Sequence, residues 1–271
     1  MNPLNIILVG AGNVATHLGQ ALQRAGHHIL QVYSRTEASA SELADLLSCN
    51  WTTELDKISA DAQLYLFCVR DAVLEELARK VYTYLRNNAS PGHNQNEGPG
   101  ALFVHTAGSM SIDLFPSIRR GVFYPMQTFS KQRPVQFSEI PVFVQSNTDE
   151  AMLLSLASQL SDHTFILDEK RRRRLHLAAV FACNFANHMY DLSARILEDA
   201  DIPFNVMLPL IDETARKVHQ LSPSQAQTGP AVRYDTNVMR HHLELLTDER
   251  DKDIYKLLSK SIHDRLRPDK D

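Results

Sequence analysis

A short run of small residues near the amino end constrains the fold of this chain more than any other feature. Residues 5–9 (NIILV) form a compact apolar run that ends at Gly10-Ala11-Gly12-Asn13-Val14-Ala15, a G-x-G-x-x-A sequence. Apolar residues then recur at helical spacing as far as Gly26. The pattern predicts a buried strand, a tight turn and a helix, in that order.

Each position of this turn suits the binding of a dinucleotide. Gly10 permits the tight turn, Gly12 lets the backbone approach a pyrophosphate, and Ala15 is small enough for close packing of the helix on the strand. The helix that opens at Asn13 and Val14 offers free N–H groups and the positive end of its dipole to the phosphates. We therefore predict cofactor binding at Gly10, Gly12, Asn13 and Val14. The alternative is a glycine turn that holds no ligand.

Strand-like and helical segments alternate through the first two thirds of the chain. Strands are predicted at residues 5–9, 28–33, 64–69, 101–105, 121–124, 140–144 and 164–167, and helices at about 14–25, 38–47, 72–85 and 149–160. The polar stretch 87–100 is interpreted as a surface insertion, because the alternation resumes after it. Alternation of this kind indicates parallel strands joined by right-handed crossovers. With the glycine turn after the first strand, it predicts a Rossmann-type, doubly wound and mainly parallel α/β sheet.

The pattern changes beyond residue 167, where no strand is predicted. Helical periodicity dominates to the end, at about 169–199, 204–221, 231–246 and 249–264. We therefore expect two domains: an NADP-binding Rossmann domain over residues 1–168, and an all-α domain for substrate binding and dimerisation over residues 169–271.

The end of the second strand indicates which dinucleotide is bound. Domains that bind NAD usually place an acidic residue there to accept a hydrogen bond from the ribose 2′-hydroxyl. This chain has Ser34-Arg35-Thr36 instead, with no acid before Glu37. A guanidinium with neighbouring hydroxyl donors suits the 2′-phosphate of NADP, and the alternative is an ordinary solvated arginine. We predict NADP as the cofactor, with Val69 lying over the nucleotide at the end of the third strand.

Charge and composition argue against several other classes of protein. The net charge is −4, from 28 basic and 32 acidic residues, which does not suggest a nucleic-acid or membrane partner. The basic run 170–174 is interpreted as a solvated helix face. The 12 histidines and 3 cysteines show neither an HExxH motif nor zinc-type spacing, so no metal site is predicted. Scattered cysteines and the lack of a signal or membrane-spanning pattern favour a cytoplasmic protein.

Candidate catalytic and substrate-binding residues follow the strands and open the long helix. His105 ends a strand, and Gly108 and Ser109 lie in the loop after it, where a nicotinamide and substrate would meet. His105 could relay a proton or could bond the loop backbone as a structural residue. At 100° per residue His176 and Asn184 share one face of an otherwise apolar helix, which indicates a polar cleft or buried side chains bonded to the backbone.

A further candidate lies in the segment Thr228-Gly229-Pro230-Ala231-Val232-Arg233-Tyr234-Asp235, which carries a helix-entry signal. Arg233 could bind a substrate carboxylate or form an ion pair between subunits.

Several motifs together resemble a known superfamily. They are Gly10–Ala15, His105-Thr106-Ala107-Gly108, Tyr124-Pro125-Met126-Gln127-Thr128-Phe129, the segment 176–185, and the segment 228–235. The chain resembles the two-domain reductases that include pyrroline-5-carboxylate reductase, ketopantoate reductase and the β-hydroxyacid dehydrogenases. Over nearly its whole length it is similar to a bacterial family of NADP oxidoreductases that joins a Rossmann-like domain to a carboxyl-terminal domain of unknown function.

Two positions depart from these families. The β-hydroxyacid dehydrogenases have a catalytic lysine followed four residues later by asparagine, whereas here His176 is followed by Val180, and Asn184 comes one turn further on. Acid catalysis centred on a lysine therefore does not carry over. Tyr234 stands where the uncharacterised family usually has glycine, so this side chain crowds a turn or lines a pocket.

The resemblance implies an NADP-dependent oxidoreductase that transfers hydride to or from a small carbonyl, imine or hydroxy-acid substrate. It also implies a homodimer, since related reductases pair through the helical domain. The alternative is a non-catalytic dinucleotide-binding protein, such as a redox sensor or a regulatory subunit, because no acid–base pair is assigned by the sequence.

Overall fold

The computed structural model describes residues 2–88 and 100–265, so most of the surface insertion predicted at 87–100 lies outside the described residues. By their internal contacts the residues form two compact units, Met1–Val180 and Phe181–Asp271. The division falls within the helix predicted at about 169–199, beyond the domain boundary that the sequence predicts at residue 168. Within the described residues, no helix is long and apolar enough to cross a membrane.

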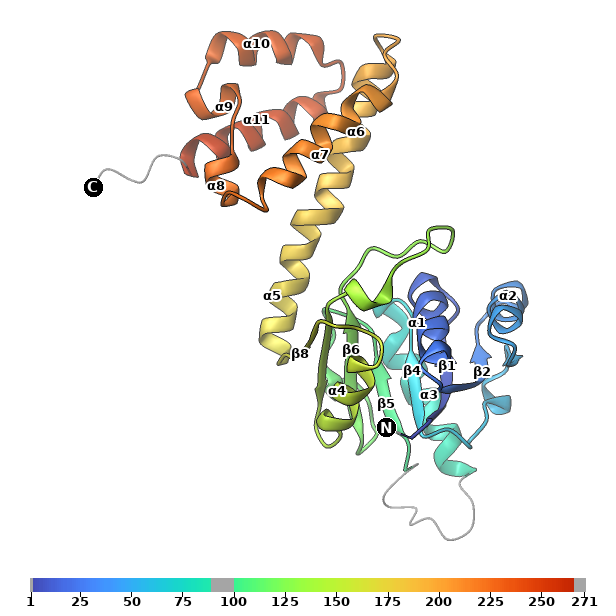
Figure 1. Ribbon diagram of the computed structural model, residues 1–271. Coiled ribbons are helices and arrows are strands. Elements are labelled where there is room, and N and C mark those ends of the chain that lie inside the picture. Colours follow the sequence, from blue (N-terminus) through green and yellow to red (C-terminus); the bar gives the residue numbers. More distant parts are fainter. Residues whose placement is uncertain (1, 89–99, 266–271) are drawn as a thin grey trace. The chain divides into compact units, whose positions relative to one another are not determined.

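An eight-stranded sheet forms the centre of the first unit (Figure 1). Its strands are β1 (Asn5–Val9), β2 (His28–Tyr33), β3 (Asn50–Thr52), β4 (Leu64–Phe67), β5 (Leu102–His105), β6 (Arg120–Pro125), β7 (Val142–Ser146) and β8 (Thr164–Ile166). Their order is β3-β2-β1-β4-β5-β6-β7-β8, and only the pairing of β6 with β7 is antiparallel. The predicted doubly wound, mainly parallel sheet is confirmed.

Four helices of the first unit cover both faces of this sheet. They are α1 (Asn13–Arg24), α2 (Glu37–Leu47), α3 (Asp71–Asn87) and α4 (Glu150–Ser158). Ile6 and Leu8 of β1 pack with apolar residues of α1, α2 and α4, whereas Ile7 and Val9 pack with those of α3. Successive residues of a strand point to opposite faces, so a strand buried on both sides must be a continuous apolar run, as β1 is.

Strand β3 was not predicted. It is three residues long, lies at the edge of the sheet, and buries only Thr52 while Trp51 stays 39% exposed. A strand this short and this exposed has no apolar run to reveal it. Its pairing with β2 nevertheless places the carboxyl end of β2 in the interior of the sheet.

The remaining helices follow β8. They are α5 (Glu169–Ala179), α6 (Ala186–Glu198), α7 (Leu208–Lys217), α8 (Pro223–Ala226), α9 (Pro230–Arg233), α10 (Thr236–Leu245) and α11 (Glu249–Arg265). A π-helical segment, Val180–Phe185, joins α5 to α6. The helical character predicted beyond residue 168 is confirmed, but the long helices are interrupted at positions that the sequence pattern did not show.

Two interruptions bear on candidate site residues. A π-turn takes more residues than an α-turn, so the 100° spacing that placed His176 and Asn184 on one face does not hold through Val180–Phe185. The helix predicted over 231–246 breaks at Tyr234, which adopts a left-handed conformation with φ of 54°. Asp235 then caps α10 by accepting a hydrogen bond from the Val238 N–H at 3.2 Å.

Candidate active site

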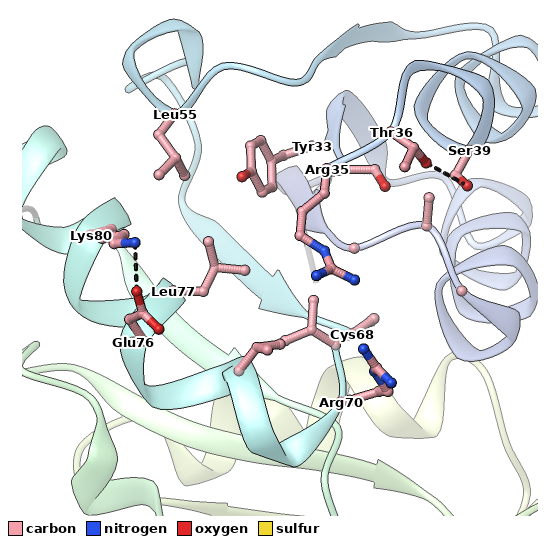
Figure 2. A pocket seen from close by; sticks show the side chains of 16 residues that line it. Tyr33, Arg35, Thr36, Ser39, Leu55, Cys68, Arg70, Glu76, Leu77 and Lys80 are labelled. Carbon is pink, nitrogen blue, oxygen red and sulfur yellow. Dashed lines mark hydrogen bonds and ion pairs between the residues drawn. The ribbon is translucent and has the colours of Figure 1, made fainter.

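A cavity of about 570 Å³ lies along the carboxyl ends of β1, β2 and β4 (Figure 2). It is lined by residues at the ends of these strands and in the turns after them, by the start of α2, by Leu55, and by α3: Gly10, Ala11, Gly12, Tyr33, Ser34, Arg35, Thr36, Ser39, Leu55, Cys68, Val69, Arg70, Val73, Glu76, Leu77 and Lys80. All the predicted cofactor-binding residues line this cavity except Asn13 and Val14. Ligands of open parallel sheets bind at this edge, at the point where the strand order reverses between β1 and β4.

The two glycines of the turn are required for different reasons. Gly10 has φ of +119°, and a Cβ there would lie 2.5 Å from the carbonyl oxygen of Cys68. Both its conformation and its surroundings therefore exclude a side chain. A Cβ on Gly12 would meet nothing within 4 Å. The space above Gly12 is open, as the approach of a pyrophosphate to the backbone requires.

The start of α1 is left free to bind an anion. Gly12 is its N-cap residue, no side chain caps the helix, and its first turn contains no acidic residue. Asn13 supports a neighbouring loop instead, because its side-chain amide donates to the Phe129 carbonyl oxygen at 2.9 Å. His17 holds the same loop through the Ser130 carbonyl oxygen at 2.9 Å and stacks on Phe129. The N–H groups and dipole of α1 therefore remain available for phosphate.

Three cations and one acid surround the cavity. Arg35 and Arg70 are exposed, and neither guanidinium has a hydrogen-bond or ion-pair partner among the residues that the structure describes. Figure 2 shows them extending toward the same part of the cavity, while Lys80 pairs with Glu76 at 2.6 Å on another side. Burial raises the pKa of Tyr33, which the positive charges of Lys80 and Arg35 oppose. The cavity thus has the positive charge that a phosphate group attracts.

A buried arginine, Arg172, stabilises the loop after β5 through hydrogen bonds to its carbonyl oxygens. Arg172 of α5 is fully buried, and its Nη1 donates to the carbonyl oxygens of Ala107, Gly108 and Met110 at 3.2, 3.0 and 2.8 Å. The interpretation of the basic run as a solvated face is therefore wrong for Arg172, although the other residues of the run are exposed. A planar guanidinium with several donors can hold several carbonyls of one turn, which explains why this arginine is buried.

His105 is wholly buried beside this loop. Its Nδ1 accepts a hydrogen bond from the Ala107 N–H at 3.1 Å, and its ring packs on Phe115. Burial lowers the pKa of His105 to about 3, and the nearby charge of Arg172 lowers it in the same direction. A ring that is neutral near pH 7 and closed to solvent suits the structural alternative better than the proton relay.

His176 and Gly108 are brought together, although they are 68 residues apart by the numbering (176 − 108). A Cβ on Gly108 would lie only 2.5 Å from Nδ1 of His176 and 2.9 Å from Cζ of Tyr124. The Tyr124 hydroxyl and Nδ1 of His176 form a hydrogen bond of 3.0 Å. Arg172 lies one helical turn before His176, so both side chains reach the same loop.

Tyr124 is the residue of this cluster that the sequence analysis did not assign to the site. It lies at the carboxyl end of β6, next to the end of β5, because Val122 is paired with His105. Its position could have indicated a role in the site, because Tyr124 carries a hydroxyl at the end of the strand next to the strand that ends at His105. The same loop is tied to the start of α3 by a hydrogen bond from the Ser109 hydroxyl to Asp71.

The two remaining candidates belong to the second unit. Asn184 lies in the π-helical segment, and Arg233 ends α9; both are exposed. Tyr234, the departure from the family pattern, packs against His263 of α11 with ring centroids 4.2 Å apart. Tyr234 therefore lies on a left-handed turn and contacts α11.

Both parts of the chain match known protein families. Residues 2–127 match a Rossmann-like domain, and residues 140–262 match a domain of unknown function, DUF2520. The crystal structure of a "putative NADP oxidoreductase" from Bacteroides fragilis is 48% identical, covers 97% of this chain and 99% of its own, and superposes with a TM-score of 0.88. The chain belongs to this family. The resemblance inferred from the motifs is confirmed.

More distant structures share the fold. An imine reductase from Myxococcus stipitatus in complex with NADP⁺ is 17% identical, with 97% of this chain and 93% of that chain covered and a TM-score of 0.62. A 1-pyrroline-5-carboxylate reductase from Streptococcus pyogenes is 13% identical, with coverage of 98% and 99% and a TM-score of 0.60. No curated protein matches the sequence.

Proposed function

We propose that the protein is an NADP-dependent oxidoreductase that transfers hydride to or from a small carbonyl, imine or hydroxy-acid substrate. The observation that carries the proposal is the cavity that joins the Gly10–Gly12 turn to Ser34, Arg35 and Thr36. The family relative from Bacteroides fragilis, described as a "putative NADP oxidoreductase", supports the same proposal. When bound, the nicotinamide cofactor supplies the hydride chemistry, and the protein supplies orientation and a proton.

The residues of the cavity fit a dinucleotide with a 2′-phosphate. Gly12 and the uncapped start of α1 would hold the pyrophosphate. Arg35 would bind the 2′-phosphate with the hydroxyls of Ser34 and Thr36, because no carboxylate of the described residues pairs with its guanidinium. An acidic residue at the same place would instead repel that phosphate. The preference for NADP over NAD thus rests on the charge at the end of β2.

The far half of the dinucleotide would reach the loop after β5, where Gly108 and Ser109 would line the substrate site. We assign proton exchange with the substrate to His176. Asn184 and Arg233 of the second unit stay predictions from the sequence, the first as a polar group of the reaction and the second as the binder of a substrate carboxylate. His105 would support the loop through Ala107 rather than exchange protons itself.

The second unit presents many apolar side chains that its own helices do not cover. Val206, Leu210, Leu245 and Leu257 are between 55% and 79% exposed. Burying such side chains is favourable by about 1.5–3 kcal/mol each, so we propose a homodimer in which a second copy covers them. Light scattering should give twice the monomer mass at micromolar concentration, and a monomer would contradict the proposal.

The proposed reaction is tested by incubating the purified protein with NADPH and a panel of keto acids, aldehydes and cyclic imines. We expect at least one compound to be reduced with loss of NADPH absorbance, at a rate that falls in His176→Ala while NADPH affinity is kept. Tight NADPH binding with no turnover for any compound would instead favour the sensor or regulatory alternative.

A further inference from the structure

The hydrogen bond between Tyr124 and His176 has a consequence for the chemistry of the site. In a neutral imidazole one ring nitrogen carries a proton and donates, and the other accepts. The hydrogen-bond partner of one nitrogen therefore determines which of the two carries the proton. Here the partner of Nδ1 is the Tyr124 hydroxyl at 3.0 Å. A phenol can donate or accept, so the direction of this bond decides the tautomer of His176.

The surroundings close one edge of the His176 ring and leave the other open. Gly108 is pressed against Nδ1 and Cγ, and its own carbonyl is fixed by Arg172 at 3.0 Å. Nε2 is not among the buried atoms left without a partner, and no described residue forms a hydrogen bond with it. Since His176 is only half-buried, Nε2 is the nitrogen open to a substrate.

We propose that Tyr124 is a positioning residue that accepts a hydrogen bond from Nδ1–H of His176, so that Nε2 is the nitrogen that exchanges a proton with the substrate. A histidine that acts as an acid is first protonated on both nitrogens, and both are then donors. A partner that accepts a hydrogen bond from Nδ1–H keeps that bond whether the ring is charged or neutral. A phenol that donated to Nδ1 would have to turn away each time the ring was charged.

The proton transfer can be written in full for a carbonyl substrate. The Nε2–H bond of the charged ring breaks, and the O–H bond of the product alcohol forms. A bound reduced dinucleotide would supply the hydride that reduces the substrate carbon and would itself be oxidised. The ring is left neutral with its proton on Nδ1, still bonded to Tyr124, and a proton from solvent restores Nε2–H. The reverse reaction uses the same atoms in the opposite order.

The tautomer can be measured without substrate or cofactor. In protein labelled with ¹⁵N-histidine, long-range ¹H–¹⁵N spectra distinguish the protonated nitrogen from the bare one, and His176→Gln identifies the signals of His176. The measurement is made at about pH 8.5, some two units above the ordinary histidine pKa of about 6.5. We expect the proton on Nδ1 in the wild-type protein, and a mixture of tautomers or a proton on Nε2 in Tyr124→Phe.

Tyr65→Phe is the matched control, because Tyr65 is also a buried tyrosine of the sheet, and its hydroxyl donates to the Ser59 carbonyl oxygen at 2.7 Å. That variant should leave the His176 signals unchanged. A wild-type proton on Nε2 would overturn the proposal, as would an unaltered tautomer in Tyr124→Phe. If Tyr124→Phe does not fold, the wild-type spectrum still decides the direction of the bond.

The inference rests on the proposed function only where it names a substrate. If a reducible substrate is found, Tyr124→Phe should lower kcat about two- to tenfold with NADPH affinity unchanged, since one hydrogen bond that orients the His176 ring is lost. An undiminished kcat would overturn the positioning role. If no compound is reduced, the proposed function fails while the spectrum still tests the tautomer.

Discussion

Replacing Gly108 with alanine tests whether the loop after β5 and the His176 helix fit together as described. The added Cβ would lie 2.5 Å from Nδ1 and 2.7 Å from Cγ of His176, and 2.9 Å from Cζ of Tyr124. Contacts this short force the surrounding side chains to shift, and overpacking of this kind costs about 1–3 kcal/mol. In a domain of this size the expected loss of melting temperature is about 2–4 °C for each kcal/mol.

A double-mutant cycle identifies the cause of that loss. His176→Ala removes the two nearest of these atoms, so Gly108→Ala should cost much less in that background. We expect a coupling of about 1 kcal/mol or more in urea unfolding. Two substitutions that add within about 0.5 kcal/mol would refute the packing of His176 on Gly108.

The other predictions concern Gly12, the Lys80–Glu76 pair and His105. Gly12→Ala should leave the unfolding free energy almost unchanged, because its Cβ meets nothing within 4 Å, yet weaken NADPH binding in a fluorescence titration; a stability loss like that of Gly108→Ala would contradict it. Lys80→Ala should weaken NADPH binding by up to about fivefold, because it removes a positive charge beside the cavity. Glu76→Gln should strengthen binding, because it removes the carboxylate that pairs with Lys80 at 2.6 Å. Equal effects of the two variants would refute a role for the Lys80 charge. The folded-state pKa of His105, about 3, lies below its unfolded value of about 6.5. The contribution of His105 to the free energy of unfolding is therefore fully present above about pH 6.5, and it falls by up to about 1.4 kcal/mol per pH unit as the pH is lowered toward 3. His105→Gln should flatten this slope in acid unfolding, and an identical slope would contradict the burial argument.

The cavity of the proposed nucleotide site could be predicted from the sequence, because the residues that form it lie in short local motifs. Gly10, Gly12 and Ser34–Thr36 lie on two strand ends that a parallel sheet must bring to one edge, and this edge is where the cavity is found. The alternation of strands and helices was sufficient to place those ends. The two positions that do not line the cavity, Asn13 and Val14, contribute the helix terminus, and Asn13 also supports the loop at Phe129.

The substrate side could be predicted only in part, because its contacts are made between distant segments. The burial of Arg172 depends on three carbonyls of a loop more than 60 residues earlier, which no local pattern of charge reveals. The partner of His176 is Tyr124, on a strand whose register with β5 is a property of the whole sheet. The sequence pattern also does not reveal the π-helical segment after α5, because a periodicity of 100° per residue assumes a regular α-helix.

The central claim is that the cavity at Gly12 and Arg35 binds a dinucleotide through its 2′-phosphate. The most direct measurement is a pair of fluorescence titrations, with NADPH and with NADH, of the wild-type protein and of Arg35→Ala. A hydrogen bond to a charged group contributes about 1.5–3 kcal/mol, so Arg35→Ala should weaken NADPH about ten- to a hundredfold and leave the Kd of NADH nearly unchanged. Equal losses for both nucleotides, or tighter binding of NADH by the wild-type protein, would contradict the account.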